Sequence, residues 1–275
     1  MTLLHAFTIL ISLYVLLCFL SVTHAAPLEE RGLGARGYSV TREGPALKPW
    51  PGNTLVYCFQ DPSIKPLFDA GWAIWESKPG FPVQRREVDC ATANKRTTLI
   101  VSSNTNKKLA TTVGFKDSSQ TMTIDLSAKV GTNDMAVNLA HEIGHALGLY
   151  HEHQKPTARN FIRVNCINLA DYDKFANSET YKDYMDVLCT NQFAASRAGF
   201  TAYDVLPFAE DYPALSDGDA IDWSSIMLYG SNFGGKKLMG VGPRQNVMTK
   251  MNGDTWRGNR VPSDGDIAQL RRLYS

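Results

Sequence analysis

The sequence lacks several features that would assign a function class directly. Its 28 Lys and Arg residues nearly balance its 27 Asp and Glu residues, so it has no basic excess of the kind that drives nucleic-acid binding. It contains no Gly-x-Ser-x-Gly sequence, the nucleophile turn of many serine hydrolases. No Asn-x-Ser/Thr acceptor occurs, and no apolar run after residue 25 is long enough to cross a bilayer. What remains is a chain of mixed charge whose function depends on particular residues.

Histidine is also scarce, and its distribution is uneven. The chain has six histidines, of which His5 and His24 lie in the first 25 residues. Three of the other four fall in the pattern His-Glu-x-x-His-x-x-Gly-x-x-His of residues 141–151. A single histidine on a helix is usually packed or solvated, but the extended pattern fixes five positions and uses every later histidine except His153. The pattern therefore predicts a metal site.

The spacing within this pattern predicts catalytic zinc. In a helix, His141 and His145 lie one turn apart on one face, which lets both imidazoles reach one ion. Glu142 is displaced by about 100° around the axis, so it approaches a zinc-bound water as a general base and is not a ligand. Gly148 allows the chain to leave the helix and bring back His151 as the third ligand. Three protein ligands leave one coordination position open, as catalytic zinc requires.

The first 49 residues have the character of targeting and processing segments. An apolar run followed by small residues predicts a secretion signal over residues 1–25, and an uncleaved membrane anchor is the alternative because no basic residue precedes the run. Residues 26–49 are rich in Gly, Arg and Glu, which favours a propeptide or a flexible tail. The bonds after Arg31 and Arg36 are candidate processing points. We therefore expect a secreted, extracellular protein with no membrane segment after signal removal.

The cysteines are consistent with secretion. Loss of Cys18 with the signal leaves four, an even number that predicts two disulfides. A zinc site made by cysteines is the competing interpretation, but the sequence has no Cys-x-x-Cys spacing. Three connectivities are open. We favour Cys58 with Cys90 and Cys166 with Cys189, because each pair then stays on its own side of the histidine pattern.

The residues before the histidine pattern predict alternating strands and a helix. Residues 54–60, 97–103 and 121–126 are expected strands, and 111–115 is a candidate edge strand that would bind an extended peptide by adding it to the sheet. Residues 63–77 place aromatic and aliphatic side chains at helical spacing, which is more typical of a core than of a ligand platform.

The expected zinc helix covers residues 132–147. Thr132 or Asn133 would cap it, and Asp134 would complement its dipole. Its apolar residues face away from the histidines, so we expect a core on one side and a cleft on the other. These apolar residues are Met135, Leu139, Ile143 and Leu147.

The chain after the zinc helix has less regular patterning. Residues 160–222 contain scattered aromatics and many turn formers, whereas 263–274 predicts a final helix capped by Ser263. We expect residues 50–275 to form one domain with an upper lobe over 50–149 and a lower lobe over 150–275.

Three other stretches were considered as sites. Residues 230–237 nearly match a phosphate loop but lack its Ser or Thr, so a surface loop is the better interpretation. Asp217, Asp219 and Asp222 lack the remainder of a calcium loop and are better explained as solvated acids. Without the histidine pattern, the apolar residues around Met227 would be interpreted as a buried turn.

Together these motifs resemble the astacin family of metzincin zinc endopeptidases over most of residues 50–275. Glu152 directly follows the third histidine, as in that family, and Met227 resembles the methionine of the metzincin turn. Tyr229, two residues later, is similar to the tyrosine that astacins use as a fifth zinc ligand and to stabilise the reacting carbonyl. Trp50-Pro51-Gly52 and the closing helix also resemble family segments.

The resemblance implies an α+β, two-lobed zinc protease. Its twisted mixed sheet and helices would form the N-terminal lobe, and an irregular C-terminal lobe would end in a helix. It implies a monomer with one Zn²⁺ per chain that hydrolyses protein or peptide substrates bound extended along the cleft. Glu142 and Tyr229 would be catalytic, Met227 an apolar floor, and Glu152 the partner of an N-terminal amine exposed by processing. A catalytically silent zinc-binding effector with the same fold is the alternative.

The sequence also departs from the family pattern. Leu228 replaces the usual His of the methionine turn, and His153 replaces the usual Gln after Glu152. No propeptide motif supplies an Asp to block the zinc, and Glu43 is a weak substitute.

Overall fold

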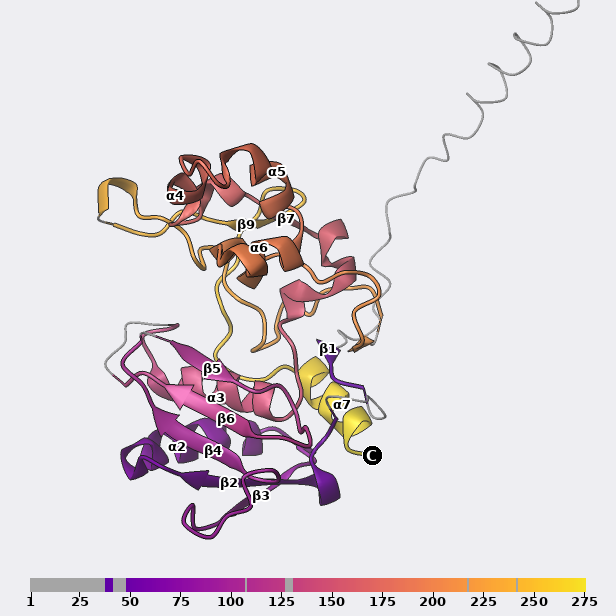
Figure 1. Cartoon of the computed structure of the whole chain (residues 1–275). Coiled ribbons are helices and arrows are strands. Elements are labelled where there is room, and N and C mark those ends of the chain that lie inside the picture. Colours follow the sequence, from indigo (N-terminus) through magenta and orange to yellow (C-terminus); the bar gives the residue numbers. More distant parts are fainter. Residues whose placement is uncertain (1–37, 42–47, 107, 127–130, 217, 241) are drawn as a thin grey trace, which may run out of the picture. The chain divides into compact units, whose positions relative to one another are not determined.

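The computed structural model describes most of the chain after residue 37 (Figure 1). The predicted signal peptide, Glu43 and most of the predicted propeptide lie outside the described residues. Within the described part, no helix is both long and apolar enough to cross a membrane. The described ranges are 38–41, 48–106, 108–126, 131–216, 218–240 and 242–275.

A mixed sheet of five strands forms the base of the zinc-helix region, in agreement with the expected mixed sheet. Its strand order is β3-β2-β4-β6-β5. The first four strands in this order run parallel, and β5 pairs antiparallel with β6 at the edge. Predicted strands appear as β2, β4 and β6, whereas β3 was not foreseen because its residues are mostly polar. The bounds are β2 Thr54–Phe59, β3 Gln84–Glu87, β4 Leu99–Ser103, β5 Leu109–Thr111 and β6 Gln120–Ile124.

The edge strand lies earlier than the sequence suggested. The prediction was 111–115, but β5 ends at Thr111 because the chain turns at Gly114, whose φ is +63°. Phe115 then exchanges backbone hydrogen bonds with Lys48 at 2.7 and 2.9 Å. These bonds draw the later residues away from β6.

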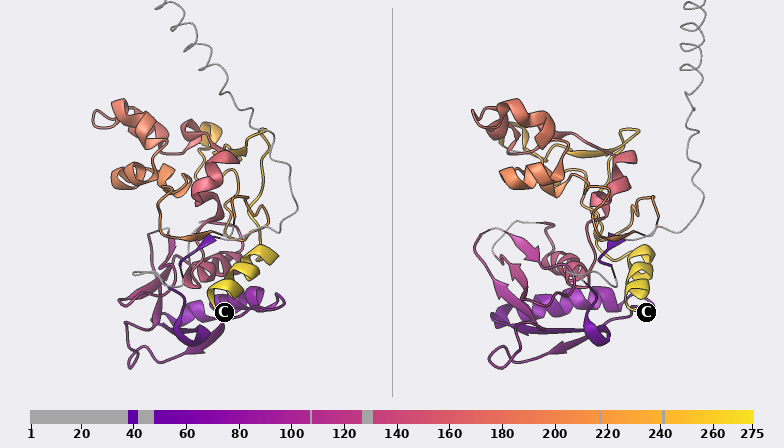
Figure 2. Two further views of the ribbon diagram at one scale, coloured as in Figure 1. Left: turned by 90° about the vertical axis from the view of Figure 1, so that its right-hand side faces the viewer. Right: turned by 45° about the vertical axis from the view of Figure 1, so that its right-hand side comes forward.

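Two helices, α2 (Lys65–Glu76) and α3 (Met135–Ala146), lie on one face of this sheet (Figures 1 and 2). They approach closely at Gly71, where an added Cβ would lie 2.8 Å from the backbone nitrogen of Ala140. The indole of Trp75 donates a 2.8 Å hydrogen bond to the Ala140 carbonyl. The predicted aromatic stripe of α2 is therefore core: Phe68, Trp72 and Trp75 are fully buried.

The start of α3 differs from the prediction. Asp134 is its N-cap, since its carboxylate accepts hydrogen bonds from the backbone N–H groups of Ala136 and Val137 at 3.0 and 3.3 Å. The hydroxyl of Thr132 instead donates a 2.8 Å hydrogen bond to Oδ1 of Asn138. A carboxylate at this position both caps the helix and complements its dipole, which favours Asp over the preceding residues.

The described residues contain two hydrophobic cores. The first joins the sheet, α2, α3 and the C-terminal helix α7 (Asp264–Leu273), which Ser263 caps as predicted. Although α7 ends the chain, it packs in the first core, whereas the sequence suggested the lower lobe. Figure 1 shows it beside α3.

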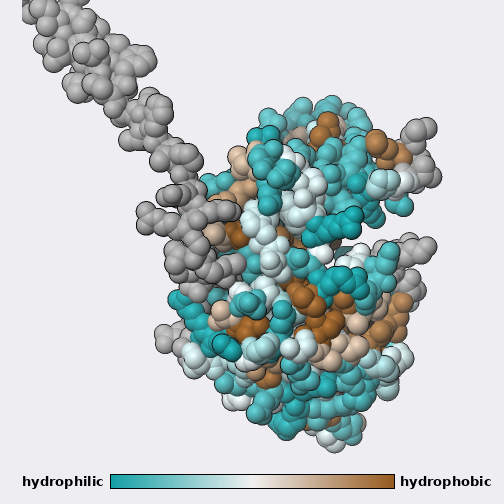
Figure 3. Space-filling model, turned by 180° about the vertical axis from the view of Figure 1, so that it is seen from behind, coloured by the Kyte–Doolittle hydropathy of each residue, from teal (hydrophilic) through white to brown (hydrophobic). Residues whose placement is uncertain are grey.

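Much of the surface in Figure 3 is hydrophilic with apolar groups interspersed.

The second core is built mainly from short elements after residue 157, where many turn-forming residues interrupt any regular apolar pattern. Helices of four to seven residues surround it, and β7 pairs antiparallel with β9. The Cys166–Cys189 disulfide cross-links this region, and the Cys58–Cys90 disulfide links β2 to the segment after β3. These are the two pairings that the sequence analysis favoured. The bounds are β7 Ile162–Val164, α4 Tyr172–Ala176, α5 Met185–Leu188, α6 Gln192–Ala198 and β9 Met248–Lys250.

A short N-terminal strand, β1 (Tyr38–Ser39), is integral to the first core. It pairs with β8 (Leu215–Ser216), and Val40 donates a 2.8 Å hydrogen bond to the carbonyl of Gly148. Tyr150 donates in turn to the carbonyl of Tyr38 at 2.9 Å. Tyr38 and Val40 are both buried, so these residues behave as part of the folded domain.

Candidate metal centre

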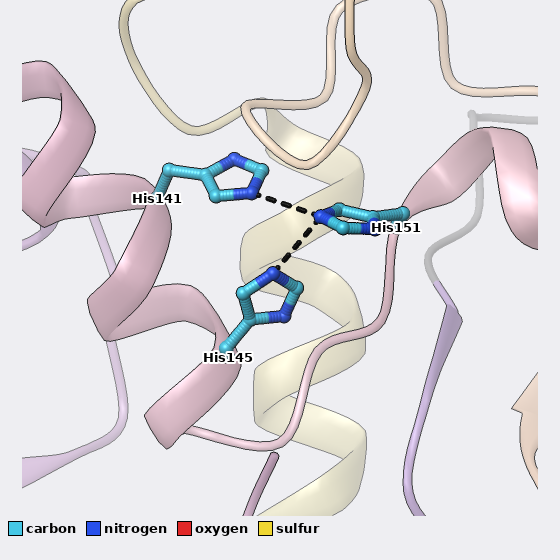
Figure 4. A group of neighbouring side chains, drawn as sticks. All are labelled: His141, His145 and His151. Carbon is cyan, nitrogen blue, oxygen red and sulfur yellow. Dashed lines mark hydrogen bonds between the residues drawn. The ribbon is translucent and has the colours of Figure 1, made fainter. Parts of the chain in front are cut away.

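Three histidines converge at the end of α3 (Figure 4). His141 and His145 project from successive turns of the helix, and His151 comes from the segment that follows it. The Nε2 atom of His151 lies 3.1 Å from that of His141 and 3.0 Å from that of His145. Gly148, with φ of +103°, makes the reversal between helix and third histidine, as predicted.

The outer ring nitrogen of each histidine faces an oxygen acceptor. His141 Nδ1 lies 2.8 Å from the carbonyl of Ile226, and His145 Nδ1 lies 2.8 Å from the carbonyl of Leu149. His151 Nδ1 lies 2.8 Å from the side-chain oxygen of Gln154. These acceptors place the ring hydrogens on Nδ1, so all three Nε2 lone pairs point inward.

Three lone pairs aimed at one point repel one another unless a cation lies between them. Zn–N bonds of 2.0–2.1 Å in a tetrahedral site set the nitrogens about 3.3 Å apart, near the distances found here. Burial lowers the pKa of His141 to about 4 and that of His145 to about 3, and it also lowers the pKa of His151. The rings are thus neutral at physiological pH, the form that binds zinc. The donor set fits zinc.

Glu142 lies beside the histidines without joining them. Its side chain is buried, which raises the pKa of its carboxyl to about 7. The hydroxyl of Thr111 on the edge strand donates a 2.6 Å hydrogen bond to its Oε2 atom. A carboxylate with this pKa is suited to accept a proton and return it near neutral pH.

The predicted methionine turn lies beneath α3. Met227 is buried, and its sulfur would lie only 2.5 Å from a Cβ added to Gly144. The turn is fixed from the C-terminal helix, because Asp266 accepts hydrogen bonds from the backbone N–H of Ile226 at 3.0 Å and from the hydroxyl of Ser225 at 2.6 Å. The methionine turn therefore contributes a carbonyl to His141 and an apolar surface to the helix.

Tyr229 is brought to the same site. Its ring centroid lies 4.2 Å from that of His151 and 5.4 Å from that of His141, and Phe233 stacks against it at 3.9 Å. Burial raises the pKa of its phenol well above the usual value, so the hydroxyl keeps its proton. His153 also lies here, with its centroid 4.8 Å from that of Tyr229.

A sequence model described as Astacin, a peptidase family, matches residues 45–195, more than half of the chain and all of the histidine pattern. The chain belongs to the astacin family. The family is one of zinc proteases, and the three histidines of this chain fit a zinc site. Among curated protein sequences, none matches this one.

Two solved structures show the same fold as this astacin. High choriolytic enzyme 1, a hatching enzyme zinc-protease from Oryzias latipes (medaka fish), is 16% identical, with a TM-score of 0.56 over 83% of this chain and 94% of that chain. Myroilysin is also 16% identical, with a TM-score of 0.54 over 86% of this chain and 98% of that chain. At this identity the likeness is one of fold, and both structures confirm the α+β metzincin architecture.

Glu152, which directly follows the third histidine, is buried beside a cation from its own segment. Lys155 contacts Glu152 Oε1 through its ammonium and donates a 3.1 Å hydrogen bond to the carbonyl of Ala220. The backbone N–H of Asp222 also donates to Glu152 Oε1, at 2.9 Å. The pairing of Glu152 with a processed N-terminal amine stays a prediction, and in this astacin the carboxylate already has a cation.

Several residues of the site were not identified from the sequence. The carbonyls of Ile226 and Leu149 are main-chain groups that carry no sequence signal. Gln154 was identifiable, because a residue three positions after a ligand is able to reach back across one turn. Thr111 gave no signal at all, since it lies 31 residues before the glutamate that it contacts.

Proposed function

We propose that this astacin is a secreted zinc endopeptidase that hydrolyses peptide bonds in proteins. The observation that carries the proposal is the convergence of three Nε2 atoms beside a buried carboxylate that is not a ligand. His141, His145 and His151 would hold one zinc ion per chain. When bound, zinc supplies Lewis-acid chemistry, polarising the substrate carbonyl and lowering the pKa of a water.

Glu142 performs the proton transfers. It accepts a proton from the attacking water and returns it to the leaving amine, a role supported by a pKa raised to about 7. Tyr229 keeps its proton at neutral pH, so its hydroxyl donates a hydrogen bond to the carbonyl oxygen as negative charge develops there. Met227 packs under the helix that carries two of the ligands and stays out of the reaction.

The substrate lies extended beside β5. An edge strand presents unpaired backbone groups to an incoming peptide, which adds as a further strand and brings its scissile bond to the histidines. The protein acts as a monomer outside the cell after removal of residues 1–25, as the two disulfides also favour.

The N-terminal boundary is placed before Tyr38 in this proposal. The sequence predicts a propeptide or a flexible N-terminal segment over residues 26–49. The burial of Tyr38 and Val40 and their hydrogen bonds to the segment before His151 support a mature chain that keeps these two residues. Cleavage after Arg36 satisfies this condition. N-terminal sequencing of secreted protein tests it.

Hydrolysis of casein by purified, secreted protein tests the function, with zinc measured by atomic absorption. We expect one zinc per chain and a loss of about 10² to 10⁴ in rate for Glu142→Gln, which keeps the shape of the side chain but not its basicity. Wild-type protein that binds one zinc and cleaves no protein would instead support the silent effector. Equal activity of Glu142→Gln and wild type would remove Glu142 from its assigned role.

A further inference from the structure

The glutamate of the site is held from outside the zinc motif. The hydroxyl of Thr111 lies 2.6 Å from Glu142 Oε2, and among the described residues this is the only hydrogen bond that the carboxylate makes. An ionised carboxylate has no hydrogen to give, so the hydroxyl donates. One oxygen of Glu142 is thus fixed, and Oε1 stays free for a water or a leaving amine.

Thr111 also faces the position where a peptide would bind. It is the last residue of β5, the edge strand, and pairs in register with Met122 of β6. The next residue, Thr112, donates its N–H to the carbonyl of Thr121 at 2.9 Å. Because bonded residues alternate along an antiparallel pair, the backbone N–H and carbonyl of Thr111 point to the open edge.

We propose that Thr111 is a positioning residue for Glu142, with its hydroxyl orienting the carboxylate while its backbone faces the bound substrate. This inference rests on the proposed endopeptidase function. A carboxylate that rotates freely points at the attacking water for only part of the time, and a hydrogen bond from Thr111 to one of its oxygens restricts that rotation. Binding of the peptide backbone and orientation of the Glu142 carboxylate then both depend on Thr111.

The neighbouring threonine provides a matched comparison. The hydroxyl of Thr112 accepts a 3.1 Å hydrogen bond from the N–H of Thr121, so it serves the sheet and not the glutamate. Thr111→Val removes the hydroxyl with little change of shape, Thr111→Ser keeps the hydroxyl, and Thr112→Val removes a hydroxyl from the same strand without touching Glu142.

Kinetics on the zinc-loaded variants separate positioning from packing. We expect Thr111→Val to lower kcat about tenfold with KM within about twofold, the effect of one lost hydrogen bond to a charged group. Thr111→Ser and Thr112→Val should stay within about threefold of wild type. Equal losses in Thr111→Val and Thr111→Ser, a change confined to KM, or full activity of Thr111→Val would overturn the proposal.

Crystal structures of the zinc-free wild type and Thr111→Val give a readout that does not depend on activity. We expect one position of the Glu142 carboxylate in wild type and a rotated or divided position in the variant. An unchanged carboxylate would refute the positioning role. If wild type cleaves no protein, the endopeptidase proposal fails on that result, and the crystal structures still decide whether Thr111 orients Glu142.

Discussion

The buried ion pair beside the third histidine predicts a large and specific loss of stability. The exposed fractions of the Lys155 and Glu152 side chains are 0% and 1%. Lys155→Met leaves the Glu152 carboxylate buried without its cation, and loss of one partner of a buried pair costs about 3–5 kcal/mol. In a domain of this size each kcal/mol lowers Tm by roughly 2–4 °C, so we expect Tm to fall by about 6–20 °C.

Thermal unfolding followed by circular dichroism measures this change, with zinc kept saturating because bound metal also raises Tm. The double variant Glu152→Gln with Lys155→Met should recover most of the loss. It removes both charges of the pair, and the Gln carbonyl still accepts the hydrogen bond from the Asp222 N–H. Lys182→Met is the matched control, since Lys182 and Glu179 form an exposed pair at the same spacing and its loss should change Tm by about 4 °C or less.

Two results would refute the reasoning about this pair. One is a Tm for Lys155→Met no lower than that of the Lys182→Met control. The other is a double variant at least as unstable as Lys155→Met alone. Either result, obtained on processed protein, would show that the Lys155 ammonium does not stabilise the protein by compensating a buried charge on Glu152.

The structure supports three further predictions. Gln154→Leu removes the acceptor of the third histidine and should weaken zinc binding about 10–100-fold in competition with a chelator. It should also lower the Tm of the metal-free protein, because the Gln154 amide donates a 2.9 Å hydrogen bond to the carbonyl of Tyr203. Gly71→Ala forces a Cβ to 2.8 Å from a backbone nitrogen of α3 and should cost about 1–3 kcal/mol in chemical unfolding, whereas Gly258→Ala, whose nearest neighbour is 3.6 Å away, should cost less. A chain that begins at residue 42 loses β1 and should unfold at a lower temperature than one that begins at residue 37; equal Tm values would contradict a structural role for the strand.

Much of the first core was predictable because its signals are local. The aromatic spacing of α2 and the 141–151 pattern each follow from the helix repeat, which is the same wherever the helix packs. The cap at Ser263 was predictable for the same reason, since a capping box involves only four consecutive residues. Local patterns predicted these elements and the three histidines that the structure brings together.

The errors arise where distant segments determine the outcome. The edge strand was displaced because Phe115 pairs with Lys48, a partner 67 residues earlier. Residues 38–40 have the composition of a tail, yet they form hydrogen bonds with the segment that follows α3 and are buried. Lys155 is a charged residue three positions from Glu152, and sequence alone gives no sign that both lie inside a core.

Backbone hydrogen bonds hold much of the metal centre of this chain in place. The carbonyl of His145 accepts hydrogen bonds from the N–H groups of Gly114 and Gly148, both at 2.8 Å, and the N–H of Glu152 donates to the carbonyl of Met227 at 3.0 Å. Such bonds restrict the path of the chain and leave most side chains free to change. Two solved structures that are 16% identical to this chain share its fold. Gln154 and Thr111 are the side chains that hydrogen-bond to His151 and to Glu142, so we expect substitutions at these two positions to change zinc affinity and the orientation of the Glu142 carboxylate.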